Sequence, residues 1–118
     1  MERVVIIDDN EALREGFSLV LKAIGKYQIV NSYGTCEDAI ANFRNDRPDI
    51  VLMDLEMPGM GGIEGIERIK SFKSDTEIIV ISVHENVELL MRALNVGAIG
   101  FITKNPTGHR GIGSPTLP

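Results

Sequence analysis

Four short apolar runs, each followed by polar residues, constrain the fold of this chain more than any other feature. Residues 4–7, 50–53, 78–81 and 101–103 are rich in β-branched side chains and are separated by stretches long enough to hold helices. Such runs are typical of strands that are buried on both faces of a parallel sheet, with helices as crossovers. We therefore expect an α/β fold with right-handed crossovers.

The intervening segments carry the remaining elements of this fold. The first has apolar residues at helical spacing, which we expect to form one stripe of a helix that Gly25 ends: Leu13, Phe17, Val20, Leu21 and Ile24. A second strand is expected over 28–32, followed by a helix that Thr35 caps and that continues through Phe43. Helices expected over 63–72 and 87–94 complete the alternation of strands and helices.

The composition fits one domain and excludes several classes of protein. The chain has 118 residues, of which 43% are hydrophobic, and a formal net charge of -5. The acidic balance argues against direct binding of nucleic acid by this segment. No apolar run approaches the roughly 20 residues that a membrane helix needs, so we expect no membrane contact and a cytoplasmic location. Cys36 is the single cysteine, which excludes an internal disulfide.

The polar residues that end the apolar runs should meet at one edge of the sheet. Asp8 and Asp9 follow the first strand, Asp54 the third, Ser82 the fourth and Lys104 the fifth. Ligands of open parallel sheets bind at the carboxyl ends of the strands. Clustered carboxylates need a cation, and Mg²⁺ prefers such oxygen ligands. An aspartate beside Mg²⁺ can attack phosphorus and hold a phosphoryl group, although each residue alone could be a structural strand end.

Taken together and in order, these residues closely resemble the receiver domains of two-component response regulators, the CheY-like domains. The resemblance covers about residues 1–105. The positions that carry it are Asp8, Asp9, the segment 54–58 (Asp-Leu-Glu-Met-Pro), Ser82, Phe101 and Lys104. It implies a flavodoxin-like, doubly wound sheet of five parallel strands in the order 2-1-3-4-5.

The resemblance also implies a function and a metal site. Asp54 would be the nucleophile that accepts a phosphoryl group from a sensor histidine kinase. Mg²⁺ would be held by Asp8, Asp9, Asp54 and the backbone carbonyl of Glu56. The chain would be a signalling domain that catalyses only its own phosphorylation and dephosphorylation, rather than an enzyme acting on other substrates.

The same resemblance implies a switch. Ser82 and Lys104 would contact phosphoryl oxygens, and Phe101 would rotate toward the space that Ser82 leaves, although Phe101 could equally be a core residue. The change would be read on the face of the fourth helix and fifth strand by an output domain, expected to be transcriptional, or by a partner protein. Glu56 and His84 would tune the phosphoryl lifetime, or be a solvated loop acid and a helix-entry residue.

The end of the chain departs from the family pattern. Receiver domains normally finish with a fifth amphipathic helix, whereas residues 106–118 are rich in Gly and Pro and carry no amphipathic pattern. We expect a receiver domain over 1–105 that lacks a readable last helix, followed by an irregular tail that is a linker or a non-native extension. The apolar surface left open on the first helix and fifth strand would favour a homodimer or weaken the fold.

Two other functions fit parts of the pattern. A Mg²⁺-dependent aspartyl-phosphate phosphatase of the haloacid dehalogenase type would also use a strand-end Asp and a Lys. Such enzymes have an Asp two positions after the nucleophile, where this chain has Glu56. The other alternative is a protein-interaction module on a receiver fold that acts without phosphorylation. The presence of all the residues expected at the phosphorylation site argues against it.

Overall fold

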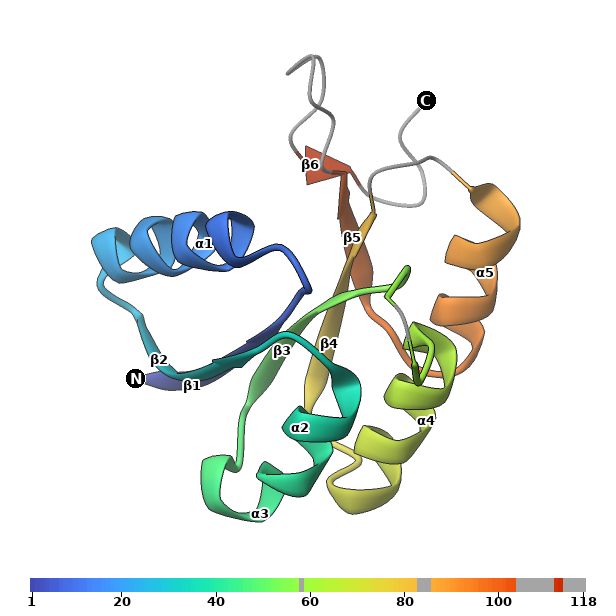
Figure 1. Cartoon of the computed structure of the whole chain (residues 1–118), viewed down its shortest axis with the longest axis horizontal. Helices are drawn as coiled ribbons and strands as arrows, with labels where there is room; N and C mark the ends of the chain where they lie inside the picture. Colours follow the sequence, from blue (N-terminus) through green and yellow to red (C-terminus); the bar gives the residue numbers. More distant parts are fainter. Residues whose placement is uncertain (58, 83–85, 104–111, 114–118) are drawn as a thin grey trace.

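The computed structural model describes residues 1–57, 59–82, 86–103 and 112–113, which form a six-stranded sheet with flanking helices (Figure 1). The strands are β1 (Glu2–Ile7), β2 (Tyr27–Tyr33), β3 (Ile50–Asp54), β4 (Glu77–Ser82), β5 (Gly100–Thr103) and β6 (Ile112–Gly113). The helices are α1 (Glu11–Ile24), α2 (Cys36–Ala41), α3 (Phe43–Asp46), α4 (Gly62–Phe72) and α5 (Val87–Asn95).

The strand order confirms the flavodoxin-like prediction. The sheet runs β2-β1-β3-β4-β5-β6, and the first five strands pair in parallel. This order places β1 and β3 side by side, with Ile7 opposite Met53 at their carboxyl ends. β4 lies on the other side of β3 and pairs Ile81 with Asp54. The residues that end these three strands are therefore neighbours.

The second predicted helix is divided into two. α2 begins after the expected N-cap, since the Thr35 side chain accepts a hydrogen bond from the Asp38 amide. It ends at Ala41, and both the backbone amide and the side chain of Asn42 donate to the Asp38 carbonyl, at 3.2 and 2.8 Å. The short α3 follows and ends before Arg47, which is left-handed with φ 43°. The fourth helix of the sequence prediction is therefore α5.

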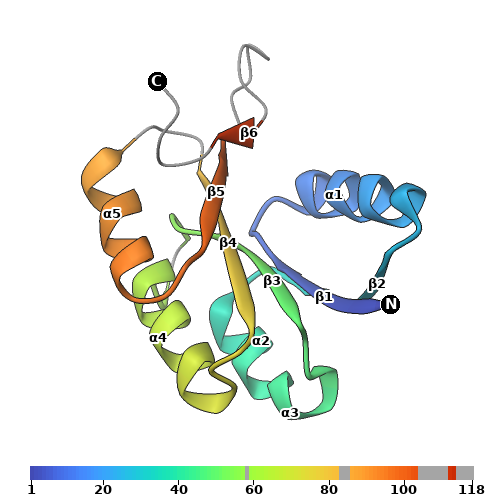
Figure 2. The same cartoon turned by 180° about the vertical axis from the view of Figure 1, so that it is seen from behind.

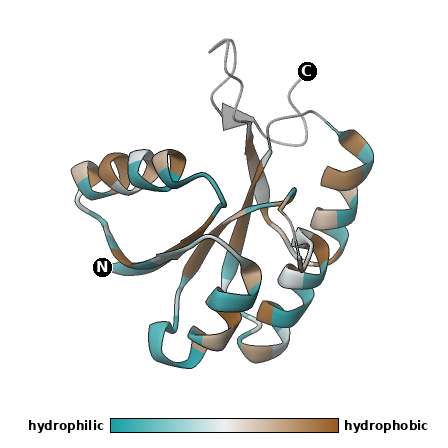
Figure 3. Cartoon of the chain, viewed as in Figure 1, coloured by the Kyte–Doolittle hydropathy of each residue, from teal (hydrophilic) through white to brown (hydrophobic). Residues whose placement is uncertain are grey.

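Strand residues alternate between two cores of different size. Val5, Ile7, Met53 and Val80 belong to the larger core, which is covered by the helices α2 to α5. Ile6 belongs to the smaller core on the opposite face, against α1. Figures 1 and 2 show α1 alone on its side of the sheet. In Figure 3 the strands are mainly apolar and the helices mix apolar and polar positions.

The apolar stripe of α1 is only partly buried. Phe17 and Leu21 of the predicted stripe pack against the smaller core. Val20 and Ile24 remain 61% and 53% exposed, so apolar surface is open on this helix, as the sequence analysis expected. They border an apolar groove of about 330 Å³ that extends across the sheet to Ile102 on β5. Within the described ranges, only α1 packs on this face of the sheet.

The predicted irregular tail contains one short element that the sequence analysis missed. Ile112 pairs with Ile102 and Gly113 with Phe101, so β6 lies antiparallel to β5. The other positions of the tail, and those at 104 and 105, lie outside the described residues. No helix in the described part of the chain is long and apolar enough to cross a membrane.

Candidate acidic site at the carboxyl ends of the strands

Asp54 is the last residue of β3 and is held almost out of solvent. The residue is 4% exposed and lies between the ends of β1 and β4. One carboxylate oxygen, Oδ1, accepts a hydrogen bond from the Glu56 amide at 3.0 Å. This bond turns the chain directly after the strand and fixes the orientation of the carboxylate toward the edge of the sheet.

Asp8 is buried in the turn between β1 and α1, and its backbone is fixed on both sides. Its amide donates to the Tyr33 carbonyl of β2 at 3.0 Å, and its carbonyl accepts from Arg14 Nη1 at 2.5 Å. Asp8 Oδ1 also accepts from the Asn10 amide at 2.9 Å. Asn10 in turn caps α1 by accepting from the Leu13 amide. The turn that carries Asp8 and the exposed Asp9 is thus held by hydrogen bonds to its neighbours.

The three aspartates among the four predicted metal ligands come together in the fold. One carboxylate oxygen from each of Asp8, Asp9 and Asp54 lies within 4.8 Å of the others. Two of the carboxylates are buried and one is exposed, so the cluster opens to solvent on one side. An all-oxygen, anionic donor set with open positions suits a hard divalent cation such as Mg²⁺. The residues present therefore fit the predicted Mg²⁺.

Ser82 ends β4 beside this cluster and is 1% exposed. Its hydroxyl lies 3.5 Å from Glu56 Oε1, at the long limit of a hydrogen bond. Glu56 thus contacts two site residues, Asp54 through its amide and Ser82 through its carboxylate. The predicted lifetime-tuning residue is therefore placed between the predicted acceptor aspartate and the predicted switch hydroxyl.

Phe101 is half-buried on β5 and packs against the larger core. Its strand neighbour across the pair is Val80 of β4, two residues before Ser82. This arrangement agrees with the core role considered for Phe101, and the rotation implied by the resemblance stays a prediction. The predicted site residues Lys104 and His84 lie outside the described residues.

Cys36 lies in the larger core beneath the acidic site. A Cβ added to Gly65 of α4 would come within 2.9 Å of its sulfur, so α2 and α4 pack very closely here. Burial raises the pKa of the Cys36 thiol to about 11, and the negative charges of Glu37, Asp54 and Glu64 contribute to the same shift. Cys36 is therefore a buried packing residue of α2.

Two residues that support the site were missed by the sequence analysis. Arg14 contacts the Asp8 carbonyl, and Glu37 Oε2 accepts a hydrogen bond from the Met60 amide at 3.0 Å. Both are ordinary polar positions on helices, and nothing in their spacing indicates these contacts. Only the packing of α1 and α2 on the sheet brings them to the loops that carry the acidic residues.

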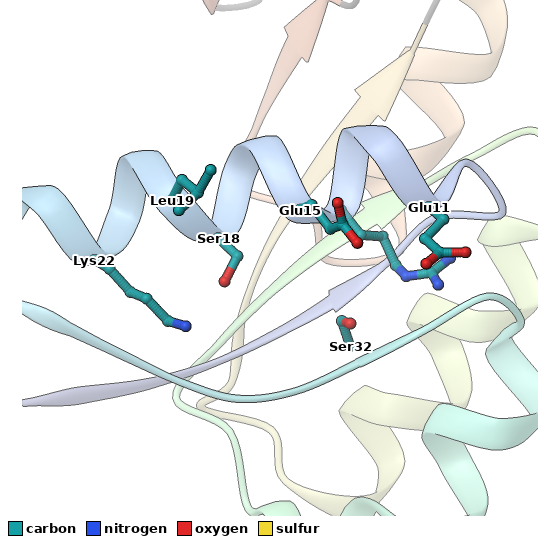
Figure 4. A pocket seen from close by; sticks show the side chains of 7 residues that line it. Glu11, Glu15, Ser18, Leu19, Lys22 and Ser32 are labelled. Carbon is teal, nitrogen blue, oxygen red and sulfur yellow. The ribbon is translucent and has the colours of Figure 1, made fainter.

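A hollow of about 360 Å³ lies between α1 and β2, next to this site (Figure 4). The close-up shows charged side chains of α1, among them Glu11, Glu15 and Lys22, above Ser32 of β2. Its lining includes Arg14 but none of the three clustered aspartates. The hollow is therefore distinct from the acidic site, although both share one supporting residue.

A doubly wound parallel sheet with an acidic cluster at the carboxyl ends of β1 and β3 defines a CheY-like α/β domain. Comparisons with known proteins agree with this class. The profile of the response regulator receiver domain family matches residues 4–110. The chain belongs to that family, whose members are signalling domains of two-component response regulators.

Individual relatives support the same assignment. Response regulator GacA of Pseudomonas viridiflava is 34% identical over 104 residues, which are 88% of this chain and 49% of GacA. Transcriptional regulatory protein YdfI of Bacillus subtilis is 35% identical, over 92% of this chain and 51% of YdfI. The chain spans about half the length of these curated relatives.

A solved structure confirms the fold independently. The signal receiver domain of the response regulator NarL from Mycobacterium tuberculosis superposes with a TM-score of 0.81 and 32% sequence identity. The match covers 88% of this chain and 84% of that one. The sheet and its helices are therefore those of a receiver domain.

Proposed function

We propose that this chain is a phosphoacceptor domain in which Asp54 takes a phosphoryl group from a sensor histidine kinase. The observation that supports this most is the clustering of Asp8, Asp9 and Asp54 within 4.8 Å at the edge of the sheet. Asp54 and Asp8 are the two buried members of this cluster, and Asp54 is the one that ends strand β3, between β1 and β4.

In the proposed reaction, a carboxylate oxygen of Asp54 forms a bond to the phosphorus of a phosphohistidine. The bond between phosphorus and the imidazole nitrogen breaks, and its electron pair stays on that nitrogen. The product is an aspartyl phosphate. Mg²⁺, held by Asp8, Asp9, Asp54 and the Glu56 carbonyl, would neutralise charge on the phosphoryl oxygens. Lys104 and the Ser82 hydroxyl would provide further contacts to those oxygens.

The proposed output is the face formed by α5 and β5. Val87 and Met91 of α5 are 68% and 50% exposed, and Ile99, which precedes β5, is 54% exposed. Apolar side chains gathered on one face are suited to a partner surface. Movement of Ser82 toward the phosphoryl group, followed by Phe101, would change this face. The partner would be an output domain, which the name of YdfI suggests is transcriptional, or a separate effector protein.

The Glu56 carboxylate and His84 would govern how long the phosphoryl group survives. Glu56 is exposed beside Asp54, and its carboxylate reaches toward Ser82. A carboxylate in this place can hold or exclude the water that hydrolyses an aspartyl phosphate. The chain would catalyse this hydrolysis and its own phosphorylation, but no reaction of a separate substrate.

The groove between α1 and the sheet supports a second, weaker proposal about partners. Its exposed apolar residues Val20 and Ile24 would be covered if two copies associated through this face.

We propose that residues 1–105 form the functional receiver, that 106–118 is a tail or linker, and that the domain acts in the cytoplasm.

The first test is to incubate the chain with Mg²⁺ and a small acyl phosphate and to measure the intact mass. We expect one added phosphoryl group in the wild type and none in Asp54→Asn, which keeps the size of the side chain. Omission of Mg²⁺ should give the same loss. A wild type that takes up no phosphoryl group, but still binds partners equally with Asp54→Asn, would instead support an interaction module that needs no phosphorylation.

A further inference from the structure

Glu37 connects helix α2 to the loop that follows Asp54. Its Oε2 accepts a hydrogen bond from the Met60 amide at 3.0 Å, although the two residues are 23 positions apart in the sequence. The backbone of Gly59 also lies directly against this carboxylate, because a Cβ placed on Gly59 would be 2.6 Å from Oε2. Gly59 has φ +83°, so a left-handed residue allows this close approach.

The base of the same loop is fixed by backbone hydrogen bonds next to the acidic site. The Leu55 amide donates to the Ile81 carbonyl at 3.2 Å, and the Gly62 amide donates to the Leu55 carbonyl at 3.3 Å. Between these bonds, the Glu56 amide donates to Asp54 Oδ1. Both ends of the loop are therefore hydrogen-bonded at Leu55, and Glu37 holds its far end at Gly59 and Met60.

We propose that Glu37 is a positioning residue that holds this loop in the geometry needed at the acidic site. The inference rests on the proposed function, since Glu56 supplies both the amide that orients Asp54 and the carbonyl expected to bind Mg²⁺. Glu37 itself contacts neither group. It acts through the Met60 amide, and its loss lets the loop move away from α2.

A simpler explanation is that Glu37 acts only through its charge. The Cys36 thiol senses the charges of Glu37, Asp54 and Glu64, so all three carboxylates lie within electrostatic range of one place in the fold. Removing any nearby negative charge weakens the attraction for a cation. The variants must therefore separate the effect of the Glu37 charge from the effect of its hydrogen bond to the Met60 amide.

Three variants make that separation. Glu37→Ala removes both the charge and the acceptor, whereas Glu37→Gln removes the charge and keeps an oxygen that can accept from Met60. Glu64→Ala is the matched control, because Glu64 is an exposed helical glutamate whose charge also reaches Cys36. Its ion pair is with Arg68 at 3.5 Å and does not involve the loop.

The direct test is hydrogen exchange of the Met60 amide in the full chain without Mg²⁺. A hydrogen bond to a charged group is worth about 1.5 kcal/mol or more, so Glu37→Ala should speed exchange by about tenfold. Glu37→Gln should retain most of the protection, and Glu64→Ala should match the wild type. Unchanged exchange in Glu37→Ala would overturn the proposal without bearing on whether Asp54 is phosphorylated.

The functional test separates metal affinity from chemistry. The Mg²⁺ concentration for half-maximal thermal stabilisation should rise by up to about tenfold in Glu37→Ala, the low end of the effect of residues that contact metal ligands directly, because Glu37 acts one contact further away. The phosphorylation rate at saturating Mg²⁺ should stay within about twofold of the wild type, because Asp54 is intact. A general loss of stability would lower the melting temperature without shifting this Mg²⁺ midpoint.

The outcomes distinguish the two claims. If Glu37→Gln and Glu64→Ala weaken Mg²⁺ binding as much as Glu37→Ala, charge alone explains the effect and the positioning role is wrong. If the wild type is phosphorylated and all variants match it, the positioning role fails and the proposed function stands. If Met60 exchange responds as expected but the wild type accepts no phosphoryl group, the proposed function fails while the contact between Glu37 and the loop is confirmed.

Discussion

The two faces of the sheet are covered very differently. On one face, helices α2 to α5 bury a large continuous core, in which Ile66 and Ile69 of α4 are almost completely excluded from solvent. On the other, α1 packs on a smaller core and leaves Val20 and Ile24 exposed beside an open apolar groove. The acidic site lies at the edge where both faces meet, with Asp8 before α1 and Asp54 before α4.

The two faces of the sheet support different residues of the acidic site. Asp54, Glu56 and Ser82 belong to strands and a loop that are supported by the larger core and by α2. Asp8 and Asp9 depend on the turn into α1, which is fixed by hydrogen bonds to β2 and Arg14 rather than by a fully buried helix. The well-covered face should therefore determine stability, and the open face should determine association.

The largest expected effect is on the well-covered face. Ile66→Ala should lower the free energy of unfolding by about 3 kcal/mol, because Ile66 is fully buried and its loss leaves a cavity. Val20→Ala on the open face should cost less than about 0.5 kcal/mol, since Val20 is 61% exposed. Urea unfolding measures both. Equal losses at the two positions would contradict the asymmetry between the two faces.

The thiol of Cys36 gives a second measure of the covered face. Its pKa is raised by burial from 9.0 to about 11, which leaves about a hundredfold less thiolate at pH 8 than in the unfolded chain. A soluble disulfide reagent should therefore react at least about a hundredfold more slowly with the native chain than with the unfolded chain. Comparable rates would mean that the contact between α2 and α4 opens readily.

The same pKa shift has a defined effect on stability. Because the folded-state pKa lies above the unfolded value, the neutral thiol stabilises the fold fully below pH 9. This contribution is lost as the pH rises from about 9 to about 11. Cys36→Ala should remove that part of the alkaline loss of stability, as measured by urea unfolding. The pKa of Tyr33 is also raised, by burial and by Asp46, so a further loss of stability should remain at higher pH.

A smaller effect is expected for association through the open face. Val20→Glu places a charge on the groove and should weaken self-association by about tenfold or more, as measured by sedimentation over a range of concentrations. Leu19→Glu is the matched control, because Leu19 is 70% exposed on the same helix but does not line the groove. A wild type that stays monomeric at high concentration would contradict the proposed homodimer.

The part of the site that could be predicted from the sequence is the part fixed by strand periodicity. Apolar runs identified the strands, so the pattern alone placed the residues that end them, Asp8, Asp54 and Ser82, at one edge of the sheet. The parallel order then brings these ends together. Resemblance to a family added the roles, which the strand pattern leaves open.

The features that were missed depend on packing between distant segments. The contact between Glu37 and Met60 requires α2 to lie against a loop 23 residues away, and spacing within the sequence gives no sign of it. The break at Asn42 falls within a segment whose apolar spacing is helical on both sides, so the spacing does not mark it. The apolar stripe of α1 correctly indicated a helix, but the spacing could not show which of its residues, here Val20 and Ile24, would remain exposed.

The most direct test of the central claim is to locate the phosphoryl group itself. The chain would be treated with an acyl phosphate, with and without Mg²⁺, reduced with borohydride, and digested for peptide mass analysis. Borohydride converts an aspartyl phosphate to homoserine, so the account predicts this change at Asp54, dependent on Mg²⁺. Homoserine at Asp8 or Asp9, or an equal yield without Mg²⁺, would contradict it.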